Sequence, residues 1–177
     1  MTPLAELAGR VYRAAHLTGE FRLRSGATSG EYFDKYLFEA DPVLLADLAL
    51  ALVPLVPAGT EALAGLELGG VPLATMVSQL TALPARFVRK EAKTYGTCRL
   101  AEGGEVAGLR VLVVEDVVTS GGQVVLSTGQ LRHAGSVVTH ALCVIDRQAG
   151  GREALAEVGV ELRALFTKAD LEAAASS

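Results

Sequence analysis

The sequence predicts an α/β protein with a central, mostly parallel sheet that is flanked by helices on both faces. From residue 62 onward, short apolar segments of strand length alternate with longer segments whose apolar residues recur at helical spacing. The apolar residues are mainly Ala, Val and Leu, and Trp is absent, which is typical of layered proteins with buried parallel strands. The 177 residues fit a single domain with a sizeable core.

The first third of the chain is expected to form two helices and a pair of short strands. Residues 3–14 are predicted to be helical, because a proline suits the first turn and apolar residues then recur at helical spacing. Residues 21–26 and 31–38 look like two short strands separated by a turn at SGATSG. A second helix opens at the Asp-Pro pair of residues 41–42 and ends near Pro54.

The rest of the chain is expected to alternate between strands and helices. In parallel sheets, ligands bind at the carboxyl ends of the strands, and the polar and Gly-rich loops of this chain follow strands. The short tail EAAASS is expected to fray. Strands are predicted at residues 62–66, 85–89, 111–114, 136–146 and 160–166, and helices at residues 71–80, 123–134 and 152–158.

Composition and charge exclude several classes of protein. The formal net charge of −4 and the sequence pI of about 5.4 show no global signature of nucleic-acid binding. The two cysteines, Cys98 and Cys143, form no CxxC motif, which argues against a zinc site or a disulfide framework. The amphipathic N-terminus lacks the apolar segment of a signal peptide, and no run approaches the length of a membrane span. A cytoplasmic protein with no membrane partner is expected.

The segment VLVVEDVVTSGG, residues 111–122, combines an anion-binding turn with two carboxylates. Residues 119–122 supply two hydroxyl groups and two glycines between a strand and a helix, where backbone N–H groups bind phosphate. No Gly-Lys-Ser/Thr follows and no GxGxxG is present, which disfavours an ordinary nucleotide triphosphate or dinucleotide site. The acids Glu115 and Asp116 directly precede this turn. The plainer alternative is a strand end with solvated acids.

Three more loops after strands offer groups suited to a charged ligand. Gly69 and Gly70 form a second Gly-rich turn that exposes backbone N–H groups to an anion. Arg147 has a fork of donors that fits a planar carboxylate or carbonyl. Each feature alone also fits an ordinary strand–helix connection or a solvated surface charge. A basic cluster before a long polar loop comprises Arg86, Arg89, Lys90, Lys93 and Arg99.

Taken together, the four loops describe one ligand. Two anion cradles, a basic loop, an acid pair and one arginine are expected at the same edge of the sheet. A molecule with phosphate at both ends and a neutral polyol between them would use all of these groups.

These segments resemble the type I phosphoribosyltransferases. The signature of that family is an apolar run, two acids, two apolar residues, Thr, a small residue and Gly, which this chain has in VLVVEDVVTSGG. Within the family, FRLRSG, YFDKY, FVRKEAKTYG and DRQAGG look like orotate phosphoribosyltransferase, over about residues 21–151. The resemblance implies the type I fold as one domain over residues 1–177. It also implies a small hood from about residues 1–40 and a flexible catalytic loop at about residues 90–108.

The resemblance also implies a reaction. The 5-phosphoribosyl group of 5-phosphoribosyl 1-diphosphate (PRPP) would pass to orotate, giving orotidine 5′-phosphate and diphosphate in de novo pyrimidine biosynthesis. Mg²⁺ would be the cofactor, held mainly by the diphosphate and the ribose hydroxyls and not directly by the protein. A homodimer is implied, with one basic loop residue reaching the partner's site, and no nucleic-acid partner.

Residue roles follow from the same resemblance. Lys93, Asp116 and Lys90 are expected to be catalytic. Orotate is expected to contact Thr119, Arg147, Arg24 and Phe33. PRPP is expected to contact Arg89, Lys90, Lys93, Tyr95, Glu115, Asp116, Val117, Val118, Thr119, Ser120, Gly121, Gly122, Gln123, Leu68, Gly69 and Gly70.

The chain departs from the family pattern at a few positions. Tyr95 stands where many members have His, and a tyrosine titrates near pH ~10 whereas a histidine titrates near neutrality. Arg24 stands where many members have Lys, and the segment YFDKY leaves Asp34 and Lys35 without an assigned role. Two alternatives remain open: a purine or other base phosphoribosyltransferase, and a regulator on the same fold that senses PRPP or a nucleotide.

Overall fold

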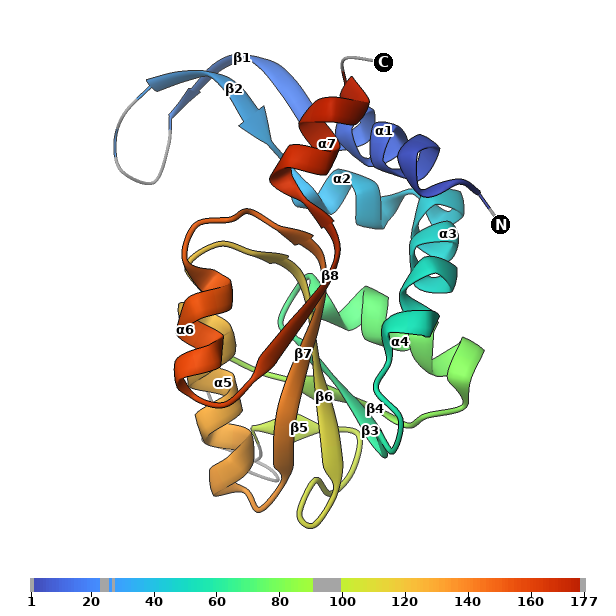
Figure 1. The fold of residues 1–177 in the computed structure, drawn as a ribbon, viewed down its shortest axis with the longest axis vertical. Coiled ribbons are helices and arrows are strands. Elements are labelled where there is room, and N and C mark those ends of the chain that lie inside the picture. Colours follow the sequence, from blue (N-terminus) through green and yellow to red (C-terminus); the bar gives the residue numbers. More distant parts are fainter. Residues whose placement is uncertain (1, 23–25, 27, 91–99, 176–177) are drawn as a thin grey trace.

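The computed structural model describes residues 2–22, 26, 28–90 and 100–175. At its centre lies a six-stranded sheet that is covered by helices (Figure 1). The strand order is β5-β4-β3-β6-β7-β8. Neighbouring strands from β4 to β8 pair in parallel, and only the short edge strand β5 is antiparallel to its neighbour β4. The strands are Ala62–Leu66 (β3), Ala85–Val88 (β4), Ala101–Glu102 (β5), Arg110–Val118 (β6), Val137–Asp146 (β7) and Glu161–Thr167 (β8). The predicted α/β architecture is therefore confirmed.

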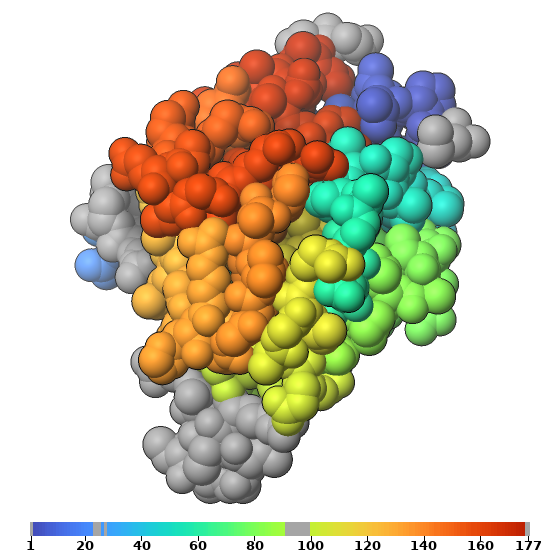
Figure 2. Space-filling view, turned by 60° about the horizontal axis from the view of Figure 1, so that its bottom comes forward, coloured from blue at the N-terminus to red at the C-terminus, as the bar shows by residue number. Residues whose placement is uncertain are grey.

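The sheet separates two hydrophobic cores, one on each face. Along β6, Leu112 and Val114 contribute to one core, while Val111 and Val113 contribute to the other, because successive side chains of a strand point to opposite faces. The first core is completed by helices Leu4–Ala15 (α1), Pro42–Leu52 (α3) and Gly70–Thr81 (α4), and the second by Gly122–His133 (α5) and Gly151–Glu157 (α6). Figure 2 shows α3 and α4, in cyan and green, on one side and the orange and red C-terminal segments on the other.

A hood lies above the carboxyl ends of the strands. It begins with an antiparallel hairpin of His16–Arg22 (β1) and Thr28–Phe33 (β2), and continues with the helix Lys35–Ala40 (α2) (Figure 1). The predicted strand over residues 31–38 was wrong in its second half. The strand stops at Phe33 because the carboxylate of Asp34 accepts a hydrogen bond from the backbone N–H of Tyr36 and so caps α2.

The C-terminal segment folds as a helix, Lys168–Ala175 (α7), which packs against α1 in the hood (Figure 1). At its start, Thr167 and Asp170 exchange side-chain and backbone hydrogen bonds in the manner of a capping box. Leu171 is buried in the first core. The tail EAAASS, residues 172–177, was expected to fray, but residues 172–175 belong to this last helix, which burial and capping stabilise. Residues 176–177 lie outside the described residues.

The strand predicted at residues 21–26 was also misplaced, because β1 covers His16–Arg22 and directly follows α1. The helices and the strands of the central sheet that were predicted lie close to their predicted positions, with one difference that matters for the site. Strand β6 does not end at residue 114 but runs to Val118, so that Glu115 and Asp116 belong to the strand itself. A short 3-10 helix, Val53–Leu55 (η1), ends the α3 segment near Pro54, as expected. Within the part of the chain that the structure describes, no helix is both long and apolar enough to cross a membrane.

Candidate active site

The turn between β6 and α5 has the geometry of an anion cradle. Thr119 and Ser120 are exposed, and Gly121 adopts a left-handed conformation with φ of +77° directly before α5. A Cβ atom on Gly121 would lie 3.0 Å from the carbonyl oxygen of Gly151, so a side chain is disfavoured there by both conformation and space. The N–H groups in the first turn of α5 have no partner within the helix and can bind an anion.

The acid pair lies just before this turn and is buried. Asp116 is 0% exposed and Glu115 is 7% exposed. The Asp116 backbone N–H donates a hydrogen bond to Glu115 Oε1 at 3.0 Å. In the sheet register Glu115 neighbours Cys143 of β7, whose pKa is raised by burial, so that the thiol stays uncharged.

A lysine from the hood reaches the acid pair. Lys35, the first residue of α2, places its Nζ 2.9 Å from Asp116 Oδ1 and 2.8 Å from Asp116 Oδ2. Burial acts to lower the pKa of Lys35, but the hydrogen bond and the charge of Asp116 outweigh it, and the pKa is raised. The ammonium group therefore stays charged and compensates a carboxylate that has no access to solvent.

A third carboxylate lies in the same place. Glu39 is one turn after Lys35 on α2, and it is 8% exposed. Burial, followed by the charge of Asp116, raises the pKa of Glu39 to about 9. Burial and the same neighbour raise the pKa of Glu115 to about 9. The cluster therefore retains protons near neutral pH, because one ammonium cannot balance three buried carboxylates.

The second Gly-rich turn lies against the acid pair. A Cβ atom on Gly69 would lie 1.7 Å from Asp116 Oδ2, and one on Gly70 would lie 2.1 Å from the carbonyl oxygen of Val114. Glycine is needed at both positions because the backbone before α4 approaches β6 so closely. Leu68, the first residue of the predicted diphosphate loop, is 59% exposed.

The basic end of β4 adjoins this loop. The Lys90 backbone N–H donates to Glu67 Oε2 at 3.1 Å, and the Glu67 N–H donates to the carbonyl of Val88 at 2.8 Å. Arg89 forms an ion pair with Glu102 of β5, with Nε 3.4 Å from Oε1. The structure therefore brings Arg89 and Lys90 beside the loop that was predicted to bind diphosphate. Lys93 and Tyr95 lie outside the described residues.

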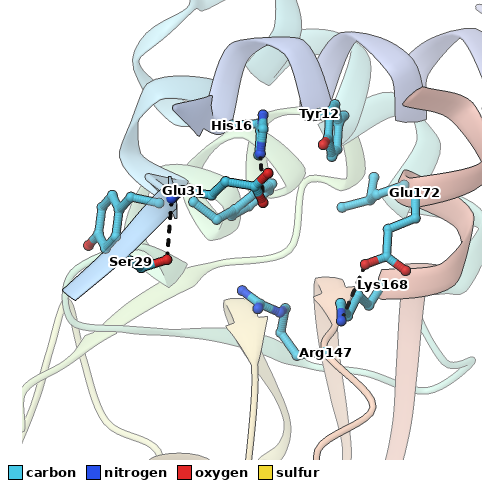
Figure 3. A pocket seen from close by; sticks show the side chains of 10 residues that line it. Tyr12, His16, Ser29, Glu31, Arg147, Lys168 and Glu172 are labelled. Carbon is cyan, nitrogen blue, oxygen red and sulfur yellow. Dashed lines mark hydrogen bonds and ion pairs between the residues drawn. The ribbon is translucent and has the colours of Figure 1, made fainter. Parts of the chain in front are cut away.

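The residues predicted to bind orotate meet between the sheet and the hood. The guanidinium carbon of Arg147 lies 5.8 Å from the centre of the Phe33 ring. The Arg147 backbone N–H donates to the carbonyl of Val118 at 2.8 Å, which places Arg147 beside the predicted Thr119. Figure 3 shows Arg147 pointing from the sheet edge into a pocket whose other walls come from the hood and α7. Arg24 lies outside the described residues.

The chain is similar over almost its whole length to proteins of known family. An orotate phosphoribosyltransferase from Nocardioides sp. is 57% identical over 174 residues, which cover 98% of this chain and 97% of that protein. The chain belongs to the orotate phosphoribosyltransferase family. No family model matches the sequence, so this assignment rests on similarity between whole chains.

Solved structures of the orotate phosphoribosyltransferase family have the same fold. The enzyme from Mycobacterium tuberculosis in complex with Fe(III) dicitrate superposes with a TM-score of 0.85 at 33% identity, over 95% of this chain and 98% of that chain. A structure of the same enzyme in complex with PRPP superposes with a TM-score of 0.82 at 30% identity, over 96% of this chain and 98% of that chain. The resemblance drawn from the sequence is therefore confirmed for family and fold.

Two residues, Lys35 and Glu39, were not assigned to the site from the sequence. Lys35 had no assigned role because it falls in the segment 31–38 that was predicted to be a strand, and Glu39, which directly follows that segment, was not considered. The signal that would have found them is the Asp34 cap followed by an acid four residues after Lys35. Read as a helix, this segment places Lys35 and Glu39 on one face.

Proposed function

We propose that this chain catalyses the transfer of the 5-phosphoribosyl group from PRPP to orotate in de novo pyrimidine biosynthesis, in the cytoplasm. The observation that carries the proposal is the meeting of a buried acid pair with two Gly-rich anion cradles at one edge of the sheet. Glu115 and Asp116 lie between the turn before α5 and the turn before α4. This order matches the order of phosphate, ribose and diphosphate along PRPP.

The reaction exchanges one bond at the anomeric carbon. The bond from that carbon to the diphosphate oxygen breaks, and its electron pair leaves with diphosphate. A ring nitrogen of orotate, after releasing its proton to water, forms the new bond to the same carbon and gives orotidine 5′-phosphate. Positive charge develops on the sugar as the first bond stretches, so negative groups near the ribose and positive groups near the diphosphate both accelerate the reaction.

The residues of β6 and its turn are proposed to bind the phosphoribosyl part. Residues 119–123 offer hydroxyl groups and the free N–H groups of α5 to the 5-phosphate. Glu115 and Asp116 accept hydrogen bonds from the ribose hydroxyls, and the charge of Asp116 favours a sugar that becomes cationic. The backbone between these two sets, at Val117 and Val118, holds them in register.

The leaving diphosphate is proposed to meet residues 68–70, Arg89, Lys90 and the loop lysine Lys93. Positive groups at this end stabilise the charge that the diphosphate gains, and one such contact typically contributes about 3 kcal/mol to the transition state. Tyr95 is expected to donate a hydrogen bond through its phenol. Closure of the loop at about residues 90–108 would exclude the water that otherwise attacks the sugar cation.

Mg²⁺ is proposed to enter with PRPP. Both oxygens of Asp116 already face the ammonium of Lys35, which would repel a second cation at that carboxylate. The oxygen ligands that Mg²⁺ prefers are available instead on the diphosphate and the ribose hydroxyls. When bound, the ion supplies positive charge that neutralises the departing diphosphate.

The base is proposed to bind between Phe33 and Arg147, with Thr119 and Arg24 as further contacts. A guanidinium beside an aromatic ring fits a planar, negatively charged base, because the ring stacks on the base and the fork of donors binds its polar edge. Orotate has this chemistry and adenine does not. This arrangement favours orotate over the purine alternative.

We further propose that the chain acts as a homodimer in which a loop residue reaches the partner's site. The test is to mix a Lys93→Ala variant with an Asp116→Asn variant, each of which is expected to have strongly reduced turnover alone. Shared sites predict that mixed dimers recover activity, and no recovery would count against them.

One assay tests the function itself. Orotate depletion is measured with and without PRPP and Mg²⁺, and in a parallel panel orotate is replaced by uracil, adenine or hypoxanthine. Depletion that needs both PRPP and Mg²⁺ is the expected result. Turnover of a purine but not of orotate would support the alternative enzyme, and PRPP binding with no turnover of any base would support a regulator.

A further inference from the structure

Helix α2 delivers two ionisable side chains to the acid pair that is proposed to bind ribose. Lys35 and Glu39 are one helical turn apart and lie on the same face of α2. The Lys35 ammonium contacts both oxygens of Asp116, at 2.9 Å and 2.8 Å. Asp116 lies on β6, so these contacts join the hood to the centre of the sheet across 81 residues of sequence.

Glu39 faces the same carboxylate. An added Cβ on Gly69 would lie 1.7 Å from Asp116 Oδ2 and 2.8 Å from Glu39 Oε1, so both oxygens border one small space. Glu39 Oε1 is buried and has no hydrogen-bond donor among the described groups. A buried oxygen without a donor is costly, and a proton on Glu39 would supply the missing hydrogen bond between the two carboxyl groups.

We propose that Lys35 and Glu39 are positioning residues that hold the buried Asp116 carboxylate in one orientation and one charge state for the ribose of PRPP. This inference rests on the proposed function and adds two residues to it. Lys35 supplies the positive charge, and Glu39 supplies a neutral hydrogen-bond donor. The hood therefore has a second role besides covering the base, because α2 sets the orientation and the charge of the Asp116 carboxylate that faces the sugar cation.

The charge state of this cluster depends on all groups around it. Asp116 and Glu115 are buried side by side, and the lysine is a positive group in direct contact with Asp116. Without it, the cluster would take up one more proton at a given pH, and the sugar would lose a negative neighbour. The titratable groups around the acid pair are Lys35, Glu39 and Cys143. Tyr36 and Asp34 act in turn on Lys35 and Glu39, and Asp146 with its partner Arg152 lies beyond Cys143.

The test compares five variants with the wild-type protein: Lys35→Met, Lys35→Arg, Glu39→Gln, Glu39→Leu and the double variant Lys35→Met with Glu39→Gln. The turnover number, the KM for PRPP and the dissociation constant of PRPP are measured across the range of pH in which the protein stays folded. Arg10→Met is the matched control, because it removes an ion pair between α1 and α3 that lies away from the acid pair. Urea unfolding of each variant reports its folding separately.

Lys35→Met is expected to lower turnover about tenfold at neutral pH and to move the acid limb of the pH profile about one unit higher, since one pH unit corresponds to a tenfold change in protonation. The dissociation constant of PRPP should change less than turnover. Glu39→Gln, which keeps a neutral donor, should behave like the wild type near neutral pH. The double variant should resemble Lys35→Met alone near neutral pH, because Glu39 already holds its proton there and Glu39→Gln removes no charge.

Two results would overturn the proposal. One is a Lys35→Met variant whose activity falls with no shift of the pH profile. The other is a Glu39→Leu variant, which cannot donate a hydrogen bond, that turns over as fast as Glu39→Gln. If Lys35→Met does not fold, Lys35→Arg and the two Glu39 variants still decide the question. A wild-type protein that does not bind PRPP would refute the proposed function itself, a result separate from these.

Discussion

The guanidinium of Arg147 lies over the ring of Phe33, with 5.8 Å between the guanidinium carbon and the ring centre. Arg147 follows β7 and Phe33 ends β2, so this contact joins the sheet to the hood. Both walls of the proposed base site are therefore set by tertiary structure. Because both residues are assigned to the base site, a change in either is expected to weaken the binding of orotate and to leave the binding of PRPP nearly unchanged.

Arg147→Ala is expected to raise the KM for orotate about tenfold to a hundredfold, because hydrogen bonds to a charged group contribute about 1.5–3 kcal/mol each. The KM for PRPP should change little. Arg147→Lys should recover only part of the loss, since an ammonium lacks the planar fork. Arg163→Ala, which removes an arginine bonded to the Leu55 carbonyl, is the control. Equal effects on both substrates would contradict a role in base binding.

Asp116→Asn is expected to raise the KM for PRPP and to lower turnover by at least about tenfold, because the amide has the shape of the carboxylate but no charge to offer a cationic sugar. Steady-state kinetics with both substrates measure this. Asp170→Asn changes an exposed helix cap and serves as the control. Normal kinetics in Asp116→Asn would make this acid a structural residue.

Lys93→Ala is expected to lower turnover by about a hundredfold while the affinity for orotidine 5′-phosphate stays nearly unchanged, because the lost charge acts on the leaving diphosphate. Turnover and product binding are measured on the same preparation. A variant that keeps wild-type turnover would remove Lys93 from the chemistry.

Gly69→Ala is expected to lower the free energy of unfolding by about 1–3 kcal/mol, the usual cost of overpacking. The added methyl group would overlap Asp116 and Glu39, so PRPP binding should weaken as well. Gly129→Ala is the matched control on α5. An added Cβ there meets nothing within 4 Å, and it should raise stability by about 0.5–1 kcal/mol. Urea unfolding distinguishes the two, and equal stabilities would refute the close approach at Gly69.

Stability should also depend on pH through the acid cluster. The pKa of Glu39 is raised to about 9 in the folded protein from an ordinary value near 4.5. The folded state therefore binds more protons than the unfolded state between these values. The contribution of Glu39 is present in full at low pH and is lost as the pH rises toward about 9.

Glu39→Gln isolates this contribution, because the glutamine does not titrate and all other groups are shared. The stability of the wild type relative to this variant should fall as the pH rises from about 6 to about 9. Urea unfolding at both ends of this range gives the difference. A constant difference would mean that Glu39 does not hold its proton in the folded state.

Much of the fold and part of the site could be predicted from local patterns. The alternation of strands and helices from residue 62 onward, the acid pair and the two Gly-rich turns all depend on neighbours within a few residues. The errors fell where local signals compete. The aromatic residues of YFDKYLF favour a strand, but the Asp34 cap starts a helix. The tail lacks a strong pattern of its own, and α7 is stable because it packs on α1.

The sequence by itself determined which chemistry the chain can offer: two carboxylates before a phosphate-binding turn, a basic loop and an arginine after a strand. Only the tertiary structure decided the protonation states and the orientations of these groups. Lys35 and Asp116 are 81 residues apart in the sequence, and no periodic pattern in the chain predicts their contact. Burial in a shared low-dielectric space makes each carboxylate depend on the others, which is a property of the folded arrangement and not of any single residue.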